Sequence, residues 1–509
     1  MAKRDRARVL MVQGTSSHAG KSVIATALCR IFARDGYQVA PFKAQNMSLN
    51  SYATPDGGEI GRSQAVQAAA ALVAPRVEMN PVLLKPEGDR RSQLVLMGRP
   101  RAVASAREYH ELKPRIWTQI TSALDQLRSE FDVVVMEGAG SPAEVNLKDH
   151  DIVNMRVALH ANAPVLLVGD IDRGGIFAQL VGTMVLLEPE ERALVCGHVI
   201  NKFRGDPSLL TSGLGFLHER TGVPVAGVVP YFNDIHIPEE DSVGLGADPE
   251  TNGDDAIDVA VMRLPHIANF DDFDPLRHEA GVRVRYVGRE SEFGDPDLVV
   301  IPGSKTTVAD LDWLRAQGLD ARITDARRRG TSVVGICAGY QMLGQELLDP
   351  DGVESAVRQS RGLGLLPTTT IFRSDKATHQ VRGRVARDEG LLGRCRGAEV
   401  VAYEIHMGET SGTDSASPFV LESRSQKQVE LPDGALDAEG LTLGTYLHGL
   451  FHNRGVRRSI LACAGARRGL GVVSTEDDID PSAEYDKLAS LVRHHLDMGL
   501  VYRAMGLKR

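Results

Sequence analysis

The residue whose sequence context most clearly suits catalysis is Cys337, which lies in the run VVGICAG at positions 333–339. A short apolar run that ends in Gly-x-Cys-x-Gly and passes into helix-forming residues is typical of a nucleophile elbow, with cysteine in place of serine. The glycines allow a tight strand-to-helix turn, and the helix start supplies backbone N–H groups and a positive dipole that favour a thiolate. A buried structural cysteine fits the same motif, so an assignment to catalysis depends on partners elsewhere.

Two histidines stand at the ends of apolar runs and could act as the base for Cys337. They are His448 in TYLHGL, positions 445–450, and His406 in YEIHMG, positions 403–408. We expect His448 to be the base that partners Cys337. His406 is the alternative base, or a residue that supports the site without taking part in the proton transfer. A cysteine and a histidine in contact form a thiolate–imidazolium pair that can attack an amide carbonyl. The oxyanion would be held by the backbone N–H groups of Ala338 and of Gly303, which follows another apolar run.

A second chemical motif lies near the N-terminus, where the apolar run 8–13 is followed by GTSSHAGKS at positions 14–22 and by helical spacing of apolar residues. A strand, a glycine-bounded loop, Lys-Ser and a helix form the context of a phosphate-binding P-loop. Gly14 and Gly20 bound this loop, Lys21 would reach the β- and γ-phosphates, and Ser22 would hold Mg²⁺. The loop has five residues between its glycines, one more than the usual motif.

Polar segments follow four further apolar runs in the N-terminal half. They are PFKAQNMSLN (41–50), EGAG (137–140), GDIDRGG (169–175) and NKFRGD (201–206). Near-continuous apolar strands that alternate with helices form a parallel sheet, and ligands bind beyond the carboxyl ends of its strands. Glycine and aspartate are also ordinary turn residues, but four such segments beside a P-loop favour a binding site. In the last segment, Asn201 and Lys202 are expected to contact the nucleotide base.

The other segments supply charged side chains suited to phosphate and metal. Glu137, an acid at a strand end, is the expected second magnesium ligand. Lys43 and Arg173 would offset the charge of phosphate or carboxylate groups. Asp170 and Asp172 could serve either metal or substrate, and the sequence does not choose between the two.

The chain is too long for one hydrophobic core. A stretch rich in acidic residues, Gly and Pro at 231–255 predicts a linker. We therefore predict an α/β domain over 1–245, a second α/β domain over 256–455 that contains the elbow, and a helical extension over 456–509 packed on the second domain.

Composition excludes several classes of protein. The net charge of −9 argues against a nucleic-acid binder. No apolar run reaches the length of a membrane span. The five cysteines form no Cys-x-x-Cys pair, which gives no zinc signature and is typical of a reducing cytoplasm.

The motifs also resemble known families. The N-terminal half is similar to the dethiobiotin-synthetase-like ATPases, whose phosphate loop also has five residues between its glycines. The C-terminal half resembles class I glutamine amidotransferases of the cobyrinate type. With QGTSS (13–17), PFKAQNMSLN (41–50), DIDRGG (170–175) and YEIHMG (403–408), nearly the whole chain is similar to the cobyric acid synthase family of cobalamin biosynthesis.

This resemblance implies an α/β fold in which a P-loop parallel-sheet ATPase domain is followed by a flavodoxin-like class I glutamine amidotransferase domain. It implies a cytoplasmic ligase that uses ATP, Mg²⁺ and glutamine to amidate the b, d, e and g carboxylates of adenosylcobyrinic acid a,c-diamide. Its partners would be small molecules, namely glutamine, ATP and the adenosylated corrinoid. Gln45 and Asn46, in the most specific stretch, would contact substrate or phosphate.

Two other functions share parts of this pattern. Cobyrinic acid a,c-diamide synthases combine the same two modules, but residues 45–50 favour the cobyric acid synthases. Partitioning-type ATPase switches resemble the N-terminal half alone, and the loop here lacks their additional signature lysine near its start.

One position departs from the class I pattern. The glutamate that orients the histidine in class I enzymes would stand two residues after it, and here that position is Leu450. The cobyrinate-type subfamily shares this gap, so we expect a Cys–His dyad. A backbone carbonyl or Glu404 would then fix the tautomer of His448.

Overall fold

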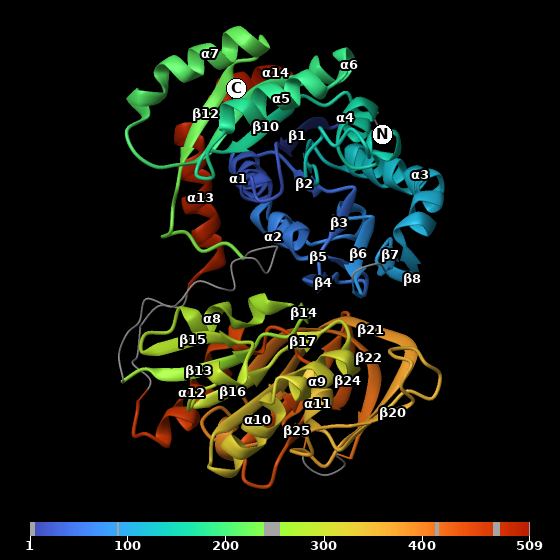
Figure 1. Cartoon of the computed structure of the whole chain (residues 1–509), viewed down its shortest axis with the longest axis vertical. Coiled ribbons are helices and arrows are strands. Elements are labelled where there is room, and N and C mark those ends of the chain that lie inside the picture. Colours follow the sequence, from blue (N-terminus) through green and yellow to red (C-terminus); the bar gives the residue numbers. More distant parts are fainter. Residues whose placement is uncertain (1–5, 89–90, 239–254, 413–416, 472–478, 508–509) are drawn as a thin grey trace.

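The computed structural model describes residues 6–88, 91–238, 255–412, 417–471 and 479–507. Figure 1 shows two α/β bodies stacked along the long axis of the molecule, the N-terminal half in blue to green and the C-terminal half in yellow to orange. The fold class predicted from the sequence is confirmed, because each body is built on a largely parallel sheet.

The first body contains six parallel strands in the order β12-β11-β10-β1-β9-β2. Their bounds are β1 (Arg8–Gly14), β2 (Val39–Phe42), β9 (Val133–Glu137), β10 (Val165–Asp170), β11 (Val195–Phe203) and β12 (Val225–Pro230). Alternate residues of β1 face opposite cores: Met11 packs with α3 (Ala106–Glu130) and α5 (Ile176–Leu186), and Val12 packs with α1 (Lys21–Arg34). Helices therefore cover both faces of the sheet, as the continuous apolar strands predict.

A small β-rich insertion lies between β2 and β9 and faces the second body in Figure 1. Its four-stranded sheet has the order β3-β6-β7-β8, and β4 pairs with β5. The elements are β3 (Gln45–Met47), β4 (Ser51–Ala53), β5 (Glu59–Gly61), α2 (Arg62–Ala70), β6 (Val82–Pro86), β7 (Arg91–Leu96) and β8 (Arg99–Ser105). The remaining helices of this half are α4 (Met155–Ala161), α6 (Pro189–Arg192) and α7 (Thr211–Thr221).

The second body has a sheet of order β15-β13-β16-β18-β26-β25, parallel except for β25. These strands are β13 (Ile257–Met262), β15 (Val282–Val287), β16 (Leu298–Ile301), β18 (Ser332–Ile336), β25 (Ala435–Leu436) and β26 (Thr442–Thr445). The helices are α8 (Asp274–Arg277), α9 (Thr307–Ala316), α10 (Leu319–Arg328), α11 (Ala338–Leu343) and α12 (Arg454–Ala466).

Two smaller sheets complete this body. In one, β14 (Ile267–Ala268) pairs with β17 (Gly303–Ser304). The other is a mixed sheet of β19 (Glu346–Leu348), β20 (Gln359–Arg361), β21 (Thr369–Val385), β22 (Glu399–Ser411), β23 (Phe419–Arg424) and β24 (Lys427–Asp433).

The C-terminal helices correct one prediction about domain organisation. The extension was expected to pack on the second body, and among its described helices only α12 does so. Helices α13 (Pro481–His495) and α14 (Met498–Met505) return to the first body, where Leu488, Val492 and Val501 join the core of α1. Figure 1 shows α13 and α14 in red beside the N-terminal sheet. The apolar stripe of α13 could pack equally well on the first or the second domain, so the sequence could not determine which of them it covers.

The insertion contacts the second body directly. The amide N–H of Ser51 donates to Oδ1 of Asn269 at 3.0 Å, and Nε2 of Gln380 donates to the carbonyl of Ala53 at 3.0 Å. Lys376 of β21, whose side chain is 7% exposed, pairs with buried Glu59 of β5 at 2.6 Å. The two bodies are therefore joined by specific polar contacts of β4 and β5, which follow the characteristic segment 41–50.

Candidate active sites

Cys337 lies at the turn between β18 and α11 with φ 54° and ψ −109°. A positive φ is uncommon for a residue with a side chain and marks a strained turn of the kind found at active sites. A Cβ atom on Gly339 would lie 1.9 Å from the backbone oxygen of Ile301, and one on Gly335 would lie 2.7 Å from the backbone of Gly339. Both glycines of the motif are thus required by close backbone approach, and the predicted elbow is present.

His448 follows β26 and is buried against a carboxylate that the sequence analysis did not identify. Its Nδ1 lies 2.7 Å from Oδ2 of Asp272, whose other oxygen accepts the N–H of Gly449 at 2.7 Å. Burial by itself would lower the pKa of His448, but the charge and hydrogen bond of Asp272, with smaller effects from Cys337, raise that pKa to about 10. His448 is therefore an imidazolium at neutral pH.

The orientation of His448 differs from the prediction. Glu404 instead pairs with Arg424 at 2.8 Å, and Leu450 is buried in the hydrophobic core. Asp272 thus joins Cys337 and His448 in one cluster, although it lies 176 residues before His448 in the sequence. It comes from a short 3-10 helix, Phe270–Phe273, that follows β14. The sequence offered one clue to Asp272, which is that two adjacent acids lie between two phenylalanines. Acids in such an apolar setting are expected to be buried, and buried carboxylates require partners.

Gly303 lies directly against the pair formed by Cys337 and His448. A Cβ atom on Gly303 would be 3.1 Å from Cε1 of His448 and 3.8 Å from Cβ of Cys337. Ala338 is the first residue of α11, so its N–H has no acceptor within the helix. These positions are compatible with the predicted pair of oxyanion donors.

His406 lies behind this site. Its ring stacks on Tyr446 with a centroid distance of 3.7 Å, and its Nδ1 is 3.2 Å from the carbonyl oxygen of Gly408. Burial lowers the pKa of His406 to about 3, so its ring is neutral. The thiol of Cys337 contacts the carbonyl oxygen of Ile405 at 3.4 Å. The geometry therefore favours His448 over His406 as the base.

The phosphate loop begins where β1 ends at Gly14 and closes at Gly20, which has φ 98° and caps α1. A Cβ atom on Gly20 would lie 2.0 Å from Nδ2 of Asn201, so this position requires glycine. The Nζ atom of Lys21 donates to the carbonyls of Ser16 at 2.8 Å and Gly140 at 3.0 Å. Lys21 therefore reaches across the mouth of the loop, where a phosphate chain would lie.

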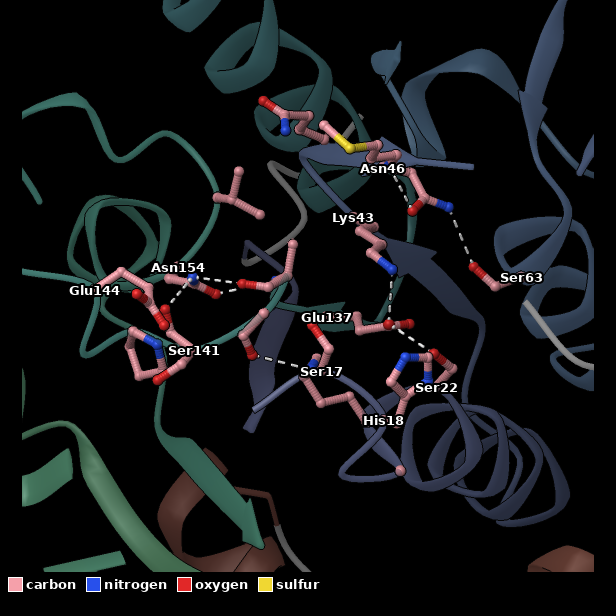
Figure 2. A pocket seen from close by; sticks show the side chains of 18 of the residues that line it. Ser17, His18, Ser22, Lys43, Asn46, Ser63, Glu137, Ser141, Glu144 and Asn154 are labelled. Carbon is pink, nitrogen blue, oxygen red and sulfur yellow. Dashed lines mark hydrogen bonds and ion pairs between the residues drawn. The ribbon is translucent and has the colours of Figure 1, made fainter. Parts of the chain in front are cut away.

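Glu137 is the centre of the polar contacts in Figure 2, with the side chains of Ser22 and Lys43 directed toward it. Its Oε1 accepts from Oγ of Ser22 at 2.8 Å and from Nζ of Lys43 at 2.9 Å, and its Oε2 accepts from Nε2 of Gln67 at 2.5 Å. A carboxylate beside a P-loop hydroxyl is the oxygen donor set that Mg²⁺ prefers, so these residues fit the ion. Gln67 was not identified from the sequence, since an amide within a helix has no distinctive signal.

A cavity of about 980 Å³ opens over this site. Gln45 and Asn46 line it, and both are held by side chains: Oε1 of Gln45 accepts from Tyr109 at 2.6 Å, and Nδ2 of Asn46 donates to Gln64 at 3.0 Å. The other charged or polar residues that line it include Lys43, Glu144, Lys148, Asp151, Arg173 and Lys202.

Residues at the carboxyl ends of β10 and β11, and in the turn after β10, lie near the phosphate loop. Buried Asp170 pairs with Nζ of Lys202 at 2.8 Å, while Asp172 pairs with Arg204 at 3.0 Å. Neither acid is among the described residues that line the cavity. Asn201 and Lys202 donate to the backbone carbonyls of residues 19 and 18 at 3.0 and 2.9 Å. Asn201 and Lys202 thus hold the phosphate loop, with Asp170 paired to Lys202 behind it, whereas Asp172 contacts Arg204 instead. Contact of Asn201 and Lys202 with the base stays a prediction.

Comparison with known proteins identifies the family of each half of the chain. Residues 10–243 match the model of the CobQ/CobB/MinD/ParA nucleotide binding domain, and residues 258–456 match that of the CobB/CobQ-like glutamine amidotransferase domain. The chain is 52% identical to a cobyric acid synthase of Moorella thermoacetica, over 99% of this chain and 98% of the relative. It is 53% identical to one of Sorangium cellulosum, over 99% of both chains.

The fold and the two sites define a nucleotide-binding, glutamine-hydrolysing ligase. With these relatives matched over their full length, the chain belongs to the cobyric acid synthase family. Its reaction is therefore the glutamine-dependent amidation that yields cobyric acid. Within the described residues, no helix combines the length and apolar character that a membrane crossing needs.

Proposed function

We propose that the enzyme amidates the b, d, e and g carboxylates of adenosylcobyrinic acid a,c-diamide, with ATP as the source of activation and glutamine as the source of nitrogen. The observation that carries this proposal is the presence in one chain of two buried polar sites, Cys337–His448–Asp272 and Lys21–Ser22–Glu137. Each supplies half of the chemistry, since one releases ammonia and the other activates a carboxylate.

In the glutaminase half, the thiolate of Cys337 attacks the side-chain amide of glutamine, and the N–H groups of Ala338 and Gly303 hold the oxyanion. His448, protonated beside Asp272, gives its proton to the departing ammonia. The resulting thioester is hydrolysed by water, with His448 now acting as base, and glutamate is released. His406 shapes the site through its stack on Tyr446.

In the amidation half, Ser22 and Glu137, which are in hydrogen-bond contact, would bind Mg²⁺, and the ion would neutralise charge on the phosphates of ATP. Lys21 lies where it can stabilise the transferred γ-phosphoryl group, and Lys43 is held beside Glu137 to offset charge on the substrate carboxylate. Phosphorylation makes the carboxylate an electrophile, and ammonia then displaces phosphate to leave the amide.

The cavity over this site is proposed to receive the corrinoid. Gln45, Asn46 and Arg173 line it, and the cationic side chains on its wall complement a substrate with several carboxylates. We also place the enzyme in the cytoplasm, since all five cysteines are free.

The reaction can be tested by incubating the protein with adenosylcobyrinic acid a,c-diamide, MgATP and glutamine, and following the number of amides by mass. We expect stepwise conversion at b, d, e and g. Absence of conversion there, with amidation of cobyrinic acid at a and c, would instead assign the diamide synthase reaction.

Replacement of Lys21 by methionine should lower amidation by about 10²- to 10³-fold, because one donor to the developing phosphoryl charge is removed. The loss should be equal with glutamine and with ammonia, since activation of the carboxylate precedes both. Glutamine hydrolysis measured alone should persist, because its site lies in the other domain. Unchanged ammonia-driven amidation in this variant would contradict the assignment of Lys21.

A further inference from the structure

The segment that carries Asp272 is held by residues of the other domain. Asn269, at its start, adopts a left-handed conformation with φ 53°, and its side chain accepts the N–H of Ser51 at 3.0 Å. The N–H of Phe270 donates to Oδ1 of Asn50 at 3.4 Å. The triad carboxylate therefore lies on a segment whose backbone is fixed by the amidation domain.

A charged contact crosses the same boundary. Nε of Arg62, the first residue of α2, lies 2.9 Å from Oδ2 of Asp271, whose side chain is 1% exposed. The contact is an ion pair rather than a hydrogen bond, because neither carboxylate oxygen of Asp271 has a hydrogen-bond partner among the described residues. Removal of Arg62 would leave a buried carboxylate uncompensated beside Asp272.

An aromatic contact crosses the boundary beside this ion pair. The guanidinium of Arg62 lies over the ring of Tyr52, 5.0 Å from its centroid. Tyr52 packs on Tyr403 with a centroid distance of 4.8 Å, and Tyr403 stacks on the ring of His448 at 5.2 Å and 20°. The amidation domain therefore contacts Asp271, the neighbour of the carboxylate that orients His448, and through Tyr52 it contacts the tyrosine that stacks on the His448 ring.

Helix α2 links this contact to the phosphate site. Five residues after Arg62, Gln67 donates to Glu137, the proposed magnesium ligand. The rise of an α-helix places these residues about 7.5 Å apart along its axis. One short rigid element thus contacts the acid of one active site and the orienting segment of the other.

We propose that Arg62 is a positioning residue of the glutaminase site: it neutralises Asp271, fixes the 269–273 segment and so holds Asp272 on His448. The inference rests on the proposed triad. It follows that glutamine hydrolysis requires α2 in its observed position. The rate of ammonia release then depends on the conformation of the amidation domain.

The test measures kcat and KM for glutamine hydrolysis, together with amidation driven by ammonia, in the full-length protein. Arg62→Met should lower kcat for glutamine by about 10- to 100-fold through misplacement of His448. It should leave KM for glutamine and the ammonia-driven rate within about twofold of wild type. Glu87→Gln is the matched control, since Glu87 pairs with Lys305 across the domain boundary at 2.6 Å without contacting the triad segment.

Two further variants separate positioning from a purely structural role. Arg62→Lys should recover part of kcat, and addition of Asp271→Asn to Arg62→Met should recover more, because both charges of the pair are then absent. Equal loss of glutamine- and ammonia-driven amidation, or a kcat like that of Glu87→Gln, would overturn the inference. If Asp272→Asn is itself without effect, the triad fails; if only Arg62→Met is without effect, the triad stands and the role of Arg62 fails.

Discussion

Replacement of Cys337 by alanine should abolish amidation driven by glutamine while leaving amidation driven by ammonia. The thiolate is the only group at the elbow that can form the thioester, so the glutamine-dependent rate should fall by about 10⁴-fold or more. The phosphate site lies in the other domain, so activation of the corrinoid carboxylates should continue. Glutamate release and amide formation, followed with each nitrogen source, measure the two halves separately.

A matched control is Cys463→Ala, which removes a partly buried thiol of the same domain on α12. It should retain both activities. Retention of glutamine-driven amidation in Cys337→Ala would show that the second domain is not the source of ammonia. Loss of both activities would show that the substitution disturbs the fold, and Cys337→Ser would then provide a smaller change in volume for the same comparison.

The second large effect is expected for Asp272→Asn. An amide can no longer stabilise the imidazolium of His448, and it can present a donor to Nδ1, which favours the wrong tautomer. Glutamine-driven turnover should fall by about 10²- to 10⁴-fold, as expected when an orienting carboxylate is lost from a catalytic triad. Ammonia-driven amidation should be retained.

The pH dependence distinguishes this cause from simple loss of structure. In the native enzyme Asp272 raises the pKa of His448 to about 10, so the protonated form needed by the leaving ammonia persists through neutral pH. Without that charge, burial lowers the pKa of His448, and the alkaline limb of kcat/KM for glutamine should move to lower pH. Glu404→Gln is the control, since Glu404 pairs with Arg424. A larger loss in Glu404→Gln than in Asp272→Asn would contradict the triad.

Several features of the fold could be predicted from local sequence. The P-loop and the elbow each lie within one strand–turn–helix unit, where backbone geometry and short-range contacts determine the conformation. Gly20 illustrates this, because its positive φ of 98° at the start of α1 is a local backbone conformation that favours glycine. Parallel strand topology also placed Glu137 and Lys43 at one sheet edge, where they meet at 2.9 Å.

Other features were decided by tertiary structure. The orienting acid is Asp272 rather than Glu404, and the helices α13 and α14 cover the first domain rather than the second. In each case a residue type or an apolar stripe was visible, but its partner depended on packing between segments far apart in the chain.

By itself, then, the sequence determined the two chemical motifs and the α/β class of both domains, and it predicted most of the residues that we propose carry the chemistry, because these follow from contiguous residues and from the rules of parallel sheets. Only the tertiary structure decided which groups orient them. Asp272 on His448, Gln67 on Glu137 and Arg62 on Asp271 are contacts that any buried acid, amide or cation of suitable reach could have made. Long-range packing selects among such candidates.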